Sequence, residues 1–366
     1  MIPHDGVVHH PLGAASYYFG ENLLQYLHIR CTHGRIIFHI GAQPNSSPHI
    51  GNITTFCTAF ALASALKSDF SREVMVKLVY VDSAPAVGKE ININGIAYQR
   101  SLGYTGDFYA NQVAFTEVLD RFSSLSKVPY EVETQNYWRS SAHFPAILQD
   151  IVNRREILGP NLSPRTNTLA IRAACPQPGC GLADKHGINN QYHEGHITFL
   201  CPNHGEFCVD QASFRHLEFN TPLRNLIRVL ICSQDRDASW ILCTGSDYAG
   251  FYQEQLLWRL LDHTPKAPIV FYTPLILDWS GAKLSKSMYV ERGAYNYLRD
   301  AGLEYMLEAD SFLNAKSGPE ALYGEIQTWV TNPYKLFRNY SIEFLHAQLM
   351  VRGMQTHIRT TESDGY

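Results

Sequence analysis

The sequence predicts an α/β fold in which a parallel sheet is split by a long insertion and followed by a short helical C-terminal region. Two observations predict it: a strand–loop–helix–strand run begins near residue 36, and strand-like segments return only after residue 238. Such a run opens a parallel sheet. The predicted strands are 36–40, 74–81, 239–243 and 268–272, and the predicted helices of the sheet are 51–67 and 252–261.

These elements divide the chain into four expected regions. They are the first half of a sheet domain (1–83), an insertion (84–225), the second half of the sheet domain (226–290) and a helical C-terminal region (291–366). In the last region, helical patterns cover 295–307, 320–330 and 333–350.

The composition is that of a globular chain. Its 366 residues are 45% hydrophobic and 17% charged, enough for two or three domains with a large core. The formal net charge of -4 counts mildly against a wide nucleic-acid surface, although it is compatible with a local basic patch. The longest apolar stretch, 53–66, is too short to span a membrane, and the N-terminus does not resemble a signal peptide. We expect a cytoplasmic protein whose cysteines are free, catalytic or metal-bound.

The segment Pro48–Asn52 (PHIGN) follows a predicted strand and opens a predicted helix. A helix N-terminus presents unpaired N–H groups and the positive end of the helix dipole, so it can hold a phosphate. His49 can donate to a phosphate oxygen, and Gly51 permits an adenine to approach the backbone closely. By itself the motif is equally compatible with a histidine in an ordinary turn.

The segment Lys283–Ser287 (KLSKS) follows a predicted strand and Gly281. Two lysines on a loop suit the charge that develops on a leaving pyrophosphate. Alone, such a segment is usually a solvated basic loop.

Together, and in this order, the two segments resemble the HIGH and KMSKS signatures of class I aminoacyl-tRNA synthetases. The segment 244–248 (TGSDY) resembles the Gly-x-Asp stretch of that class, which lies against the ribose and adenine. The resemblance implies a Rossmann-like catalytic domain that binds ATP. It implies catalytic roles for His49, Lys283 and Lys286, and nucleotide contacts from Pro48, Gly51, Asn52, Gly245, Asp247 and Ser285.

Two short-spaced pairs of metal-ligating residues lie about 20 residues apart in the insertion. Cys175 and Cys180 form the first pair, and Cys201 and His204 form the second. This spacing predicts a tetrahedral zinc ribbon over about 172–210, with a structural ion because four protein ligands leave no open position. The alternative is a loop of free thiols. The reserve ligands are Cys208, His186, His193 and His196.

With a zinc ribbon in the insertion, the chain is most similar to class I lysyl-tRNA synthetases. The segment 216–224 is similar to the tryptophan- and arginine-rich stretch of that family but lacks the tryptophans. The resemblance covers about 35–290. That family continues into a large helical anticodon-binding domain, whereas 288–366 is long enough for only a few helices.

Three functions are compatible with this pattern. The first is a tRNA-dependent cyclodipeptide synthase of the arginine-containing kind found in fungi, which joins arginine from arginyl-tRNA to a second aminoacyl group. The second is an ATP-dependent ligase, a truncated lysyl- or arginyl-type synthetase paralogue, and the near-intact ATP signatures favour it. The third is an inactive tRNA-binding module. The expected partners are the acceptor end of charged tRNA and an amino acid, arginine or lysine.

Further candidate residues follow from these functions. Ser46 and Ser47 are candidate nucleophiles for an aminoacyl group, although either also suits a turn. Asp82, Asp107 and Asp247 are candidate partners of a cationic side chain. The aromatic residues in 104–109 and 137–138 either stack on bases or belong to the core.

Overall fold

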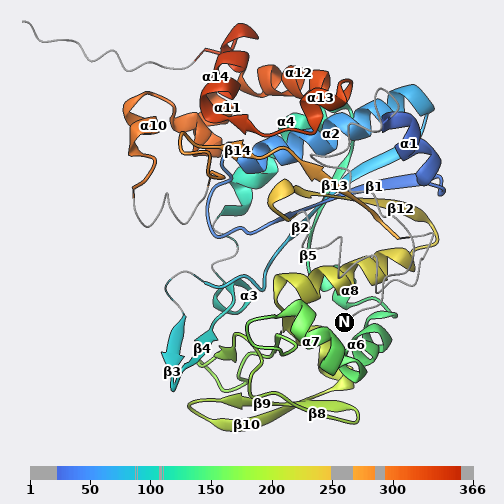
Figure 1. The fold of residues 1–366 in the computed structure, drawn as a ribbon, viewed down its shortest axis with the longest axis vertical. Coiled ribbons are helices and arrows are strands. Elements are labelled where there is room, and N and C mark those ends of the chain that lie inside the picture. The colour runs from blue at the N-terminus through green and yellow to red at the C-terminus, as the bar shows by residue number, and fades with distance from the viewer. Residues whose placement is uncertain are drawn as a thin grey trace, which may run out of the picture.

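A parallel five-stranded sheet forms the centre of the molecule, in the order β13-β12-β1-β2-β5 (Figure 1). The computed structural model describes residues 23–86, 88, 90–106, 109, 111–248, 267–284 and 293–355. The strands are β1 (Arg35–Ala42), β2 (Glu73–Tyr80), β5 (Tyr130–Thr134), β12 (Ala238–Gly245) and β13 (Ile269–Thr273). The predicted fold class is thereby confirmed. The helix predicted over 252–261 lies outside the described residues.

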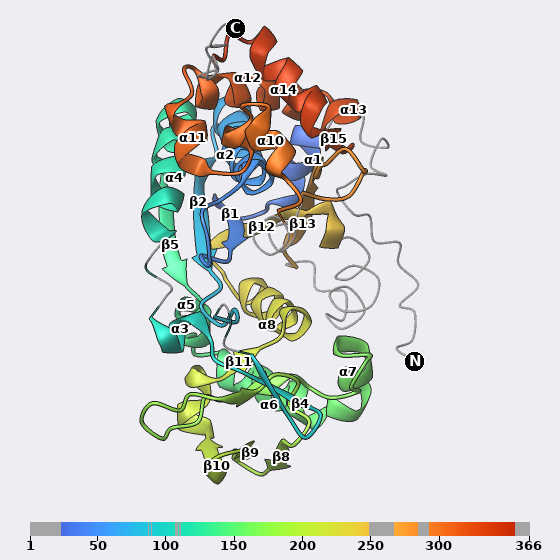
Figure 2. The ribbon, with the colours of Figure 1, turned by 90° about the vertical axis from the view of Figure 1, so that its left-hand side faces the viewer.

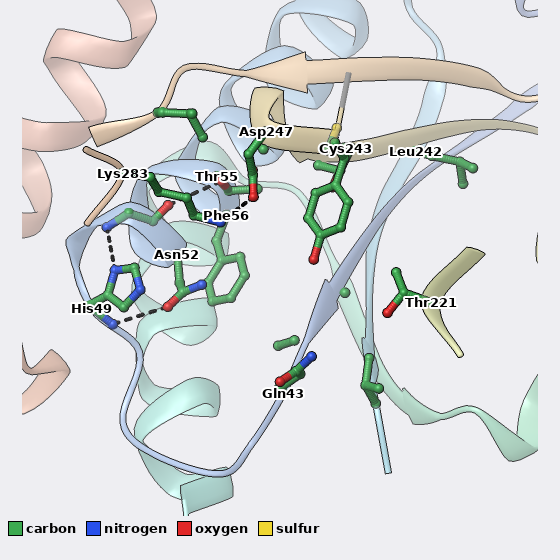
Figure 3. A pocket seen from close by; sticks show the side chains of 18 of the residues that line it. Gln43, His49, Asn52, Thr55, Phe56, Thr221, Leu242, Cys243, Asp247 and Lys283 are labelled. Carbon is green, nitrogen blue, oxygen red and sulfur yellow. Dashed lines mark hydrogen bonds and ion pairs between the residues drawn. The ribbon is translucent and has the colours of Figure 1, made fainter. Parts of the chain in front are cut away.

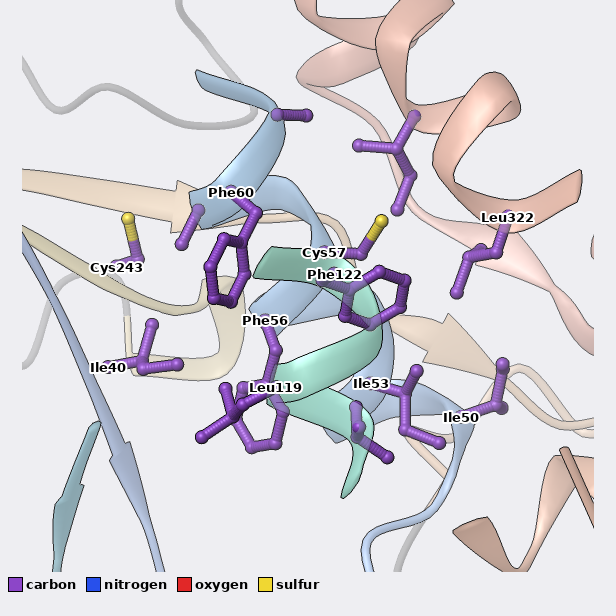
Figure 4. Close-up of a cluster of buried hydrophobic side chains, with 14 of the residues drawn as sticks. Ile40, Ile50, Ile53, Phe56, Cys57, Phe60, Leu119, Phe122, Cys243 and Leu322 are labelled. Carbon is purple, nitrogen blue, oxygen red and sulfur yellow. The ribbon is translucent and has the colours of Figure 1, made fainter. Parts of the chain in front are cut away.

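Helices α1 (Leu23–Arg30), α2 (Ile50–Phe70) and α4 (Gln112–Ser126) cover one face of the sheet. Phe56 and Phe60 of α2 pack against Phe122 of α4 and Ile40 of β1 (Figure 4). Because α2 is buried on nearly all sides, its sequence is apolar all round rather than amphipathic. No helix in the described part of the chain is long and apolar enough to cross a membrane.

The C-terminal helices pack on the same face as α2. They are α10 (Asn296–Asp300), α11 (Ala309–Asn314), α12 (Gly318–Val330), α13 (Pro333–Leu336) and α14 (Ile342–Val351), with a short 3-10 helix, η6 (Glu304–Met306). The single helical stretch expected over 333–350 is wrong. The chain instead forms a short strand, β15 (Tyr340–Ser341), because Tyr340 pairs with Ile276 of β14 (Ile276–Leu277). Ser341 then caps α14.

Helix α8 (Thr221–Ser233) covers the opposite face of the sheet (Figure 2). Val229 packs with Leu242 and Val270, and Cys232 packs with Trp240. Because α8 leads directly into β12, it anchors the preceding segment beneath the sheet.

The segment between β5 and α8 has a hydrophobic core of its own, centred on Trp138, Phe144 and Phe219 (Figure 1). Its helices are α5 (Asn136–Arg139), α6 (Phe144–Asn153), α7 (Arg155–Leu162) and η3 (Gln211–His216). Its strands are β6 (Ile171–Arg172), β7 (Ala183–Asp184), β8 (Gln191–His193), β9 (His196–Cys201), β10 (Gly205–Asp210) and β11 (Glu218–Phe219). The short hairpin β3 (Ile91–Ile93) and β4 (Ile96–Gln99) joins it by pairing with β7, and α3 (Leu102–Thr105) follows that hairpin.

A partly buried ion pair joins the sheet to this second core. Asp82, just after β2, accepts a hydrogen bond from Arg139 of α5 at 2.8 Å, and both side chains are at most 16% exposed. Arg139 also donates to the carbonyl of Leu217, so one guanidinium connects three segments.

We expect Arg139→Ala to lower the free energy of unfolding by about 2 kcal/mol, between the values for exposed and fully buried pairs, because it removes the partner of the partly buried carboxylate of Asp82. Arg154→Ala is the matched control, since Arg154 pairs with Asp150 on the surface and such pairs contribute about 0–1 kcal/mol. Urea unfolding of both variants measures the difference. Equal, small losses would mean that the partly buried pair contributes no more than the surface pair.

Candidate functional site

A cavity of about 570 Å³ lies at the carboxyl ends of β1, β12 and β13. Open parallel sheets place their ligands at this edge, where the loops that follow neighbouring strands come together. The walls are the loop after β1, the end of β12, the loop after β13 and one face of α8. Figure 3 shows that Thr221 of α8 lies across the cavity from His49 and Lys283.

His49 forms the N-cap of α2 through a reciprocal pair of hydrogen bonds. Its Nδ1 accepts from the backbone N–H of Gly51 at 3.1 Å, and its own N–H donates to Oδ1 of Asn52 at 3.3 Å. Because a backbone N–H only donates, Nδ1 is the acceptor, and the neutral ring carries its proton on Nε2. The cap thus makes Nε2 a donor at the helix N-terminus.

Gly51 leaves room for the ring of His49. A Cβ at this position would lie 2.9 Å from Cε1 of His49 and 3.1 Å from Nδ1, so the ring would have to shift. The predicted approach of an adenine to Gly51 stays a prediction. The side chain of Asn52 takes part in capping the helix, so it has a structural role that does not depend on any ligand.

Three threonines hold the start of α2 against the sheet. Thr55 bonds to the buried hydroxyl of Thr273 on β13 at 3.0 Å, and Thr273 donates to the carbonyl of Thr244 on β12. The N-terminus of α2 is therefore fixed relative to both strands.

Asp247 and Lys283 form an ion pair at the edge of the cavity. Lys283 Nζ donates to Oδ2 of Asp247 at 2.5 Å (Figure 3). A Cβ on Gly245 would lie 2.5 Å from Oδ1 of Asp247, so only glycine leaves room for this carboxylate. The predicted segments 244–248 and 283–287 thus meet through a direct contact.

A tight turn after β14 positions Lys283. Oδ1 of Asp278 accepts from the backbone N–H groups of Ser280 and Ala282, and Gly281 has a φ of 78°. Lys283 then pairs with Leu277 across the turn. The other predicted residues of this loop, Ser285 and Lys286, lie outside the described residues, as does Asp107.

Ser46 and Ser47 line the same cavity as His49. Ser47 Oγ accepts from the backbone N–H of Ala309 at the start of α11, at 3.1 Å. Ser46 Oγ donates to the carbonyl of Ser47 at 3.2 Å. The C-terminal helices therefore brace the serine loop, and Pro48 follows it directly into the cap of α2.

The structure separates the other candidates from the cavity. Asp82 is paired with Arg139 and is not among the lining residues. Trp138 is 1% exposed and belongs to the core, and the ring of Tyr137 stacks on Trp240. Tyr104 lies against Gly181, where a Cβ would come within 2.4 Å of its ring. The core interpretation of residues 137–138 is thus the correct one.

Sequence reasoning missed one wall of the cavity. Thr221, Arg224, Asn225 and Arg228 all line it from α8, and His39 lines it from β1. Their spacing on α8 is i, i+3, i+4 and i+7, which places them on one helix face. Polar residues at that spacing on an otherwise apolar helix were the signal available in the sequence.

The four predicted metal ligands come together. The ligand atoms of Cys175, Cys180, Cys201 and His204 lie within 4.8 Å of one another. Cys180 Sγ is 3.7 Å from Cys201 Sγ, and His204 Nδ1 is 3.5 Å from the sulfurs of Cys175 and Cys201. Tetrahedral zinc, with Zn–S of about 2.3 Å and Zn–N of about 2.0 Å, separates sulfurs by about 3.8 Å and sulfur from nitrogen by about 3.5 Å. The group can hold a metal, and its spacings fit zinc.

The surroundings of Cys201 favour a thiolate, the form that binds metal. Burial opposes ionisation, but hydrogen bonds from the backbone of Asn203 and the side chain of His204 outweigh it, and the pKa of Cys201 falls to about 7. Burial raises the pKa of its neighbour Cys175 to about 11, so without an ion the pair favours one thiolate, on Cys201. None of the reserve ligands, Cys208, His186, His193 and His196, belongs to the group.

Comparison with known proteins leaves family and activity open. No family model and no curated protein matches the sequence. An arginyl-tRNA synthetase from Plasmodium falciparum aligns with 88% of this chain and 56% of its own, at 7% identity and a TM-score of 0.39. A glutamate-tRNA synthetase from Elizabethkingia anophelis aligns with 86% of this chain and 70% of its own, at 13% identity and a TM-score of 0.38. A protein described as an arginyl-tRNA synthetase from Campylobacter jejuni aligns with 84% and 74%, at 8% identity and a TM-score of 0.33. These alignments are too weak to assign the chain to a class of enzyme. The structure itself defines an α/β protein with a cavity at the edge of its sheet.

We expect Gly51→Ala to disturb ligand binding without unfolding the protein, because the new methyl group would displace the ring of His49. The affinity for an adenosine nucleotide should fall about tenfold, as expected for one lost charge-assisted contact. Isothermal titration with ATP measures it. Gly34→Ala is the control, since nothing lies within 4 Å of its added Cβ. Wild-type affinity in Gly51→Ala would contradict the role of the cap.

We expect about one zinc per chain, lost in Cys175→Ser and in Cys201→Ser. Loss of the metal should also unfold the small sheet of β8, β9 and β10, because metal binding and folding are coupled in such sites. Metal analysis and limited proteolysis measure the two effects. Cys208→Ser, on β10 but outside the cluster, should keep the metal. A metal-free protein that resists proteolysis as well as the metal-loaded one would contradict this.

Proposed function

We propose that the protein is an enzyme of aminoacyl chemistry whose cavity holds the adenosine of an aminoacyl-tRNA or of an aminoacyl adenylate. One observation carries the proposal. The cap of α2, the Gly245–Asp247 turn and Lys283 line one cavity, although they come from segments nearly 240 residues apart. Those are the segments that resemble class I synthetase signatures, and their convergence is what a shared nucleotide site requires.

The described residues suggest how the nucleotide would be held. The Nε2–H of His49 and the first N–H groups of α2 would donate to a phosphate oxygen. Lys283 would bring a positive charge to the same phosphates, and Asp247 holds that lysine at the edge of the cavity. We expect the other lysine of this loop, Lys286, to supply a second positive charge to the phosphates.

Of the reactions that use such a site, we propose first the tRNA-dependent synthesis of a cyclodipeptide. Ser46 and Ser47 line the cavity that contains the nucleotide cradle, so an aminoacyl ester on a terminal adenosine would lie near them. Ser47 Oγ already accepts an N–H, which lowers its nucleophilicity. Ser46 is therefore the stronger candidate to take the aminoacyl group from the tRNA, releasing the ribose hydroxyl. The amine of a second aminoacyl-tRNA would then attack this ester, which frees the Ser46 hydroxyl and leaves a dipeptidyl-tRNA. The free amine of the dipeptide would attack the remaining tRNA ester, closing the ring and releasing the ribose hydroxyl of the second tRNA.

The second candidate is an ATP-dependent amino-acid ligase. The observation that favours it is the preserved nucleotide cradle, since His49, Gly51, Gly245 and Asp247 are all held by specific contacts. Peptide formation from charged tRNA consumes no ATP, but a cradle for ATP would equally hold the terminal adenosine of a tRNA.

Selection of arginine, which the resemblance implied, has limited support in the described residues. Asp247 is the one carboxylate among the described lining residues, and it is paired with Lys283. Asp82 is occupied by Arg139. A guanidinium of the substrate would have to displace Lys283 from Asp247 or reach Asp107.

The zinc site is proposed as structural. Its three cysteines belong to a small buried cluster with Tyr98 of β4, and none of the four ligands lines the cavity. A bound ion would tie the two cysteine loops together and stabilise this part of the insertion.

Incubation with purified aminoacyl-tRNAs tests the reaction. We expect arginyl-tRNA and a second aminoacyl-tRNA to yield a cyclo-arginyl dipeptide without ATP once the tRNAs are charged. Ribonuclease should abolish the product, and mass spectrometry detects it. A product that needs ATP directly and is insensitive to ribonuclease would favour the ligase. Amino-acid-dependent exchange of pyrophosphate into ATP is its positive test.

We expect His49→Ala and Lys286→Ala each to lower the rate at least about tenfold with the fold intact, because each removes charge stabilisation. His143→Ala and Lys316→Ala are the matched controls, since both side chains are exposed and neither lines the cavity. Rates of product formation and melting curves are measured together. Wild-type rates in His49→Ala and Lys286→Ala would mean that neither residue takes part in the reaction.

We expect Ser46→Ala to abolish a covalent aminoacyl-enzyme and Ser47→Ala to weaken it only moderately, because Ser47 braces the loop against α11. Intact-protein mass spectrometry after mixing with arginyl-tRNA measures the adduct. An undiminished adduct in Ser46→Ala would move the nucleophile to another residue.

A further inference from the structure

His39 has a polar atom that finds no partner within the described residues. It lies on β1, is 1% exposed and lines the cavity, and its Nε2 makes no hydrogen bond. Burial, and next the charge of Arg228, hold the pKa of His39 well below its usual range, so the ring is neutral. A buried polar atom without a partner is costly, which is a reason to expect a ligand opposite it.

Arg228 is the nearby cation, and its charge is uncompensated in the described part of the chain. It lines the cavity from α8, its Nε is buried without a hydrogen-bond partner, and no described carboxylate lies within ion-pair distance. Arg228 as a whole is half-buried, and a guanidinium that is partly removed from water is normally stabilised by a carboxylate or phosphate partner.

Arg224 lies one turn earlier on the same face of α8, and its charge also depresses the pKa of His39. Thr221, at the first turn, accepts a hydrogen bond from Arg224 at 3.2 Å. Helix α8 thus has its N-terminus at this wall of the cavity, and the positive end of the helix dipole adds to the positive potential there.

Arg228 is the lining cation for which no described carboxylate partner is found, since the carboxylate of Asp247 is paired with Lys283. Figure 3 shows Thr221 of α8 across the cavity from His49 and Lys283. Arg228 lines the cavity from the same helix, two turns after Thr221. The charge on this wall suits an oxyanion and disfavours a cationic side chain.

We propose that His39, Arg224 and Arg228 form an oxyanion subsite that takes a backbone phosphate at the 3′ end of the substrate tRNA. The inference rests on the proposed function, because a terminal adenosine in the cradle brings the phosphates of its own strand into the same cavity. Arg228 supplies a bidentate, charge-assisted contact, and His39 adds one from a neutral ring. The contact is to the backbone, so it positions the acceptor end without reading its sequence.

Binding of a short RNA hairpin that ends in CCA tests the subsite. We expect Arg228→Gln to weaken binding roughly tenfold and to reduce the slope of log affinity against log salt by about 0.7–0.9, the value for one lost phosphate contact. Arg228→Lys, which keeps the charge, should keep the wild-type salt slope. Arg236→Gln is the control, since Arg236 is exposed just beyond α8 and does not line the cavity.

The outcomes separate the subsite from the proposed function. Wild-type affinity and salt slope in Arg228→Gln would overturn the subsite. A variant that loses affinity for free glutamate but not for the hairpin would also overturn it, because the residues would then bind a carboxylate. Equal binding of hairpins with and without the terminal adenosine would instead count against the nucleotide cradle. If Arg228→Gln does not fold, a competition experiment on the wild-type protein replaces it. Inorganic phosphate at 10 mM, about tenfold above a millimolar dissociation constant, should compete with the hairpin. Absence of competition would overturn the proposal.

Discussion

The parallel pairing of β1 with β12 is the interaction on which the cavity depends. Ile40 pairs with Cys243, so the loop that carries His49 and the turn that carries Asp247 leave the sheet side by side. The pairing of β12 with β13 then brings the Lys283 turn to the same edge. Without this register the segments that resemble nucleotide-binding signatures would have no common site.

The elements around the sheet each stabilise one part of that edge. Above it, the C-terminal helices contact the serine loop through Ala309, and Asn339 accepts from the backbone of Leu275 and from Ser246. Below it, α8 supplies the basic wall, and the Asp82–Arg139 pair fixes the second core to the end of β2. The cavity therefore has one side formed by His49, Asp247 and Lys283 and another formed by the basic residues of α8, which is the arrangement that the proposed binding of an acceptor strand requires.

Local patterns were enough to predict four of the five strands of the sheet (β5, inside the expected insertion, was missed), the helix that begins after His49 and the cluster of candidate metal ligands. Each depends on residues close together in sequence: apolar runs, a cap followed by a helix, or two pairs of ligands on short loops. The break between α13 and α14 could not be predicted in this way, because Tyr340 forms a strand only through its distant partner Ile276. The basic wall was missed for a similar reason, since α8 shows its polar face only when the sheet buries the other one.

The sequence by itself determined the fold class, the start of the helix after His49 and the set of candidate metal ligands, because backbone hydrogen bonding and ligand chemistry are short-range properties. Only the tertiary structure decided which charged side chains pair with one another. It paired Asp82 with Arg139 and Asp247 with Lys283, and it left Arg228 and His39 facing the cavity without a described partner. Charge pairing acts between side chains that are distant in sequence, and burial sets its strength, so it exists only once the chain has folded.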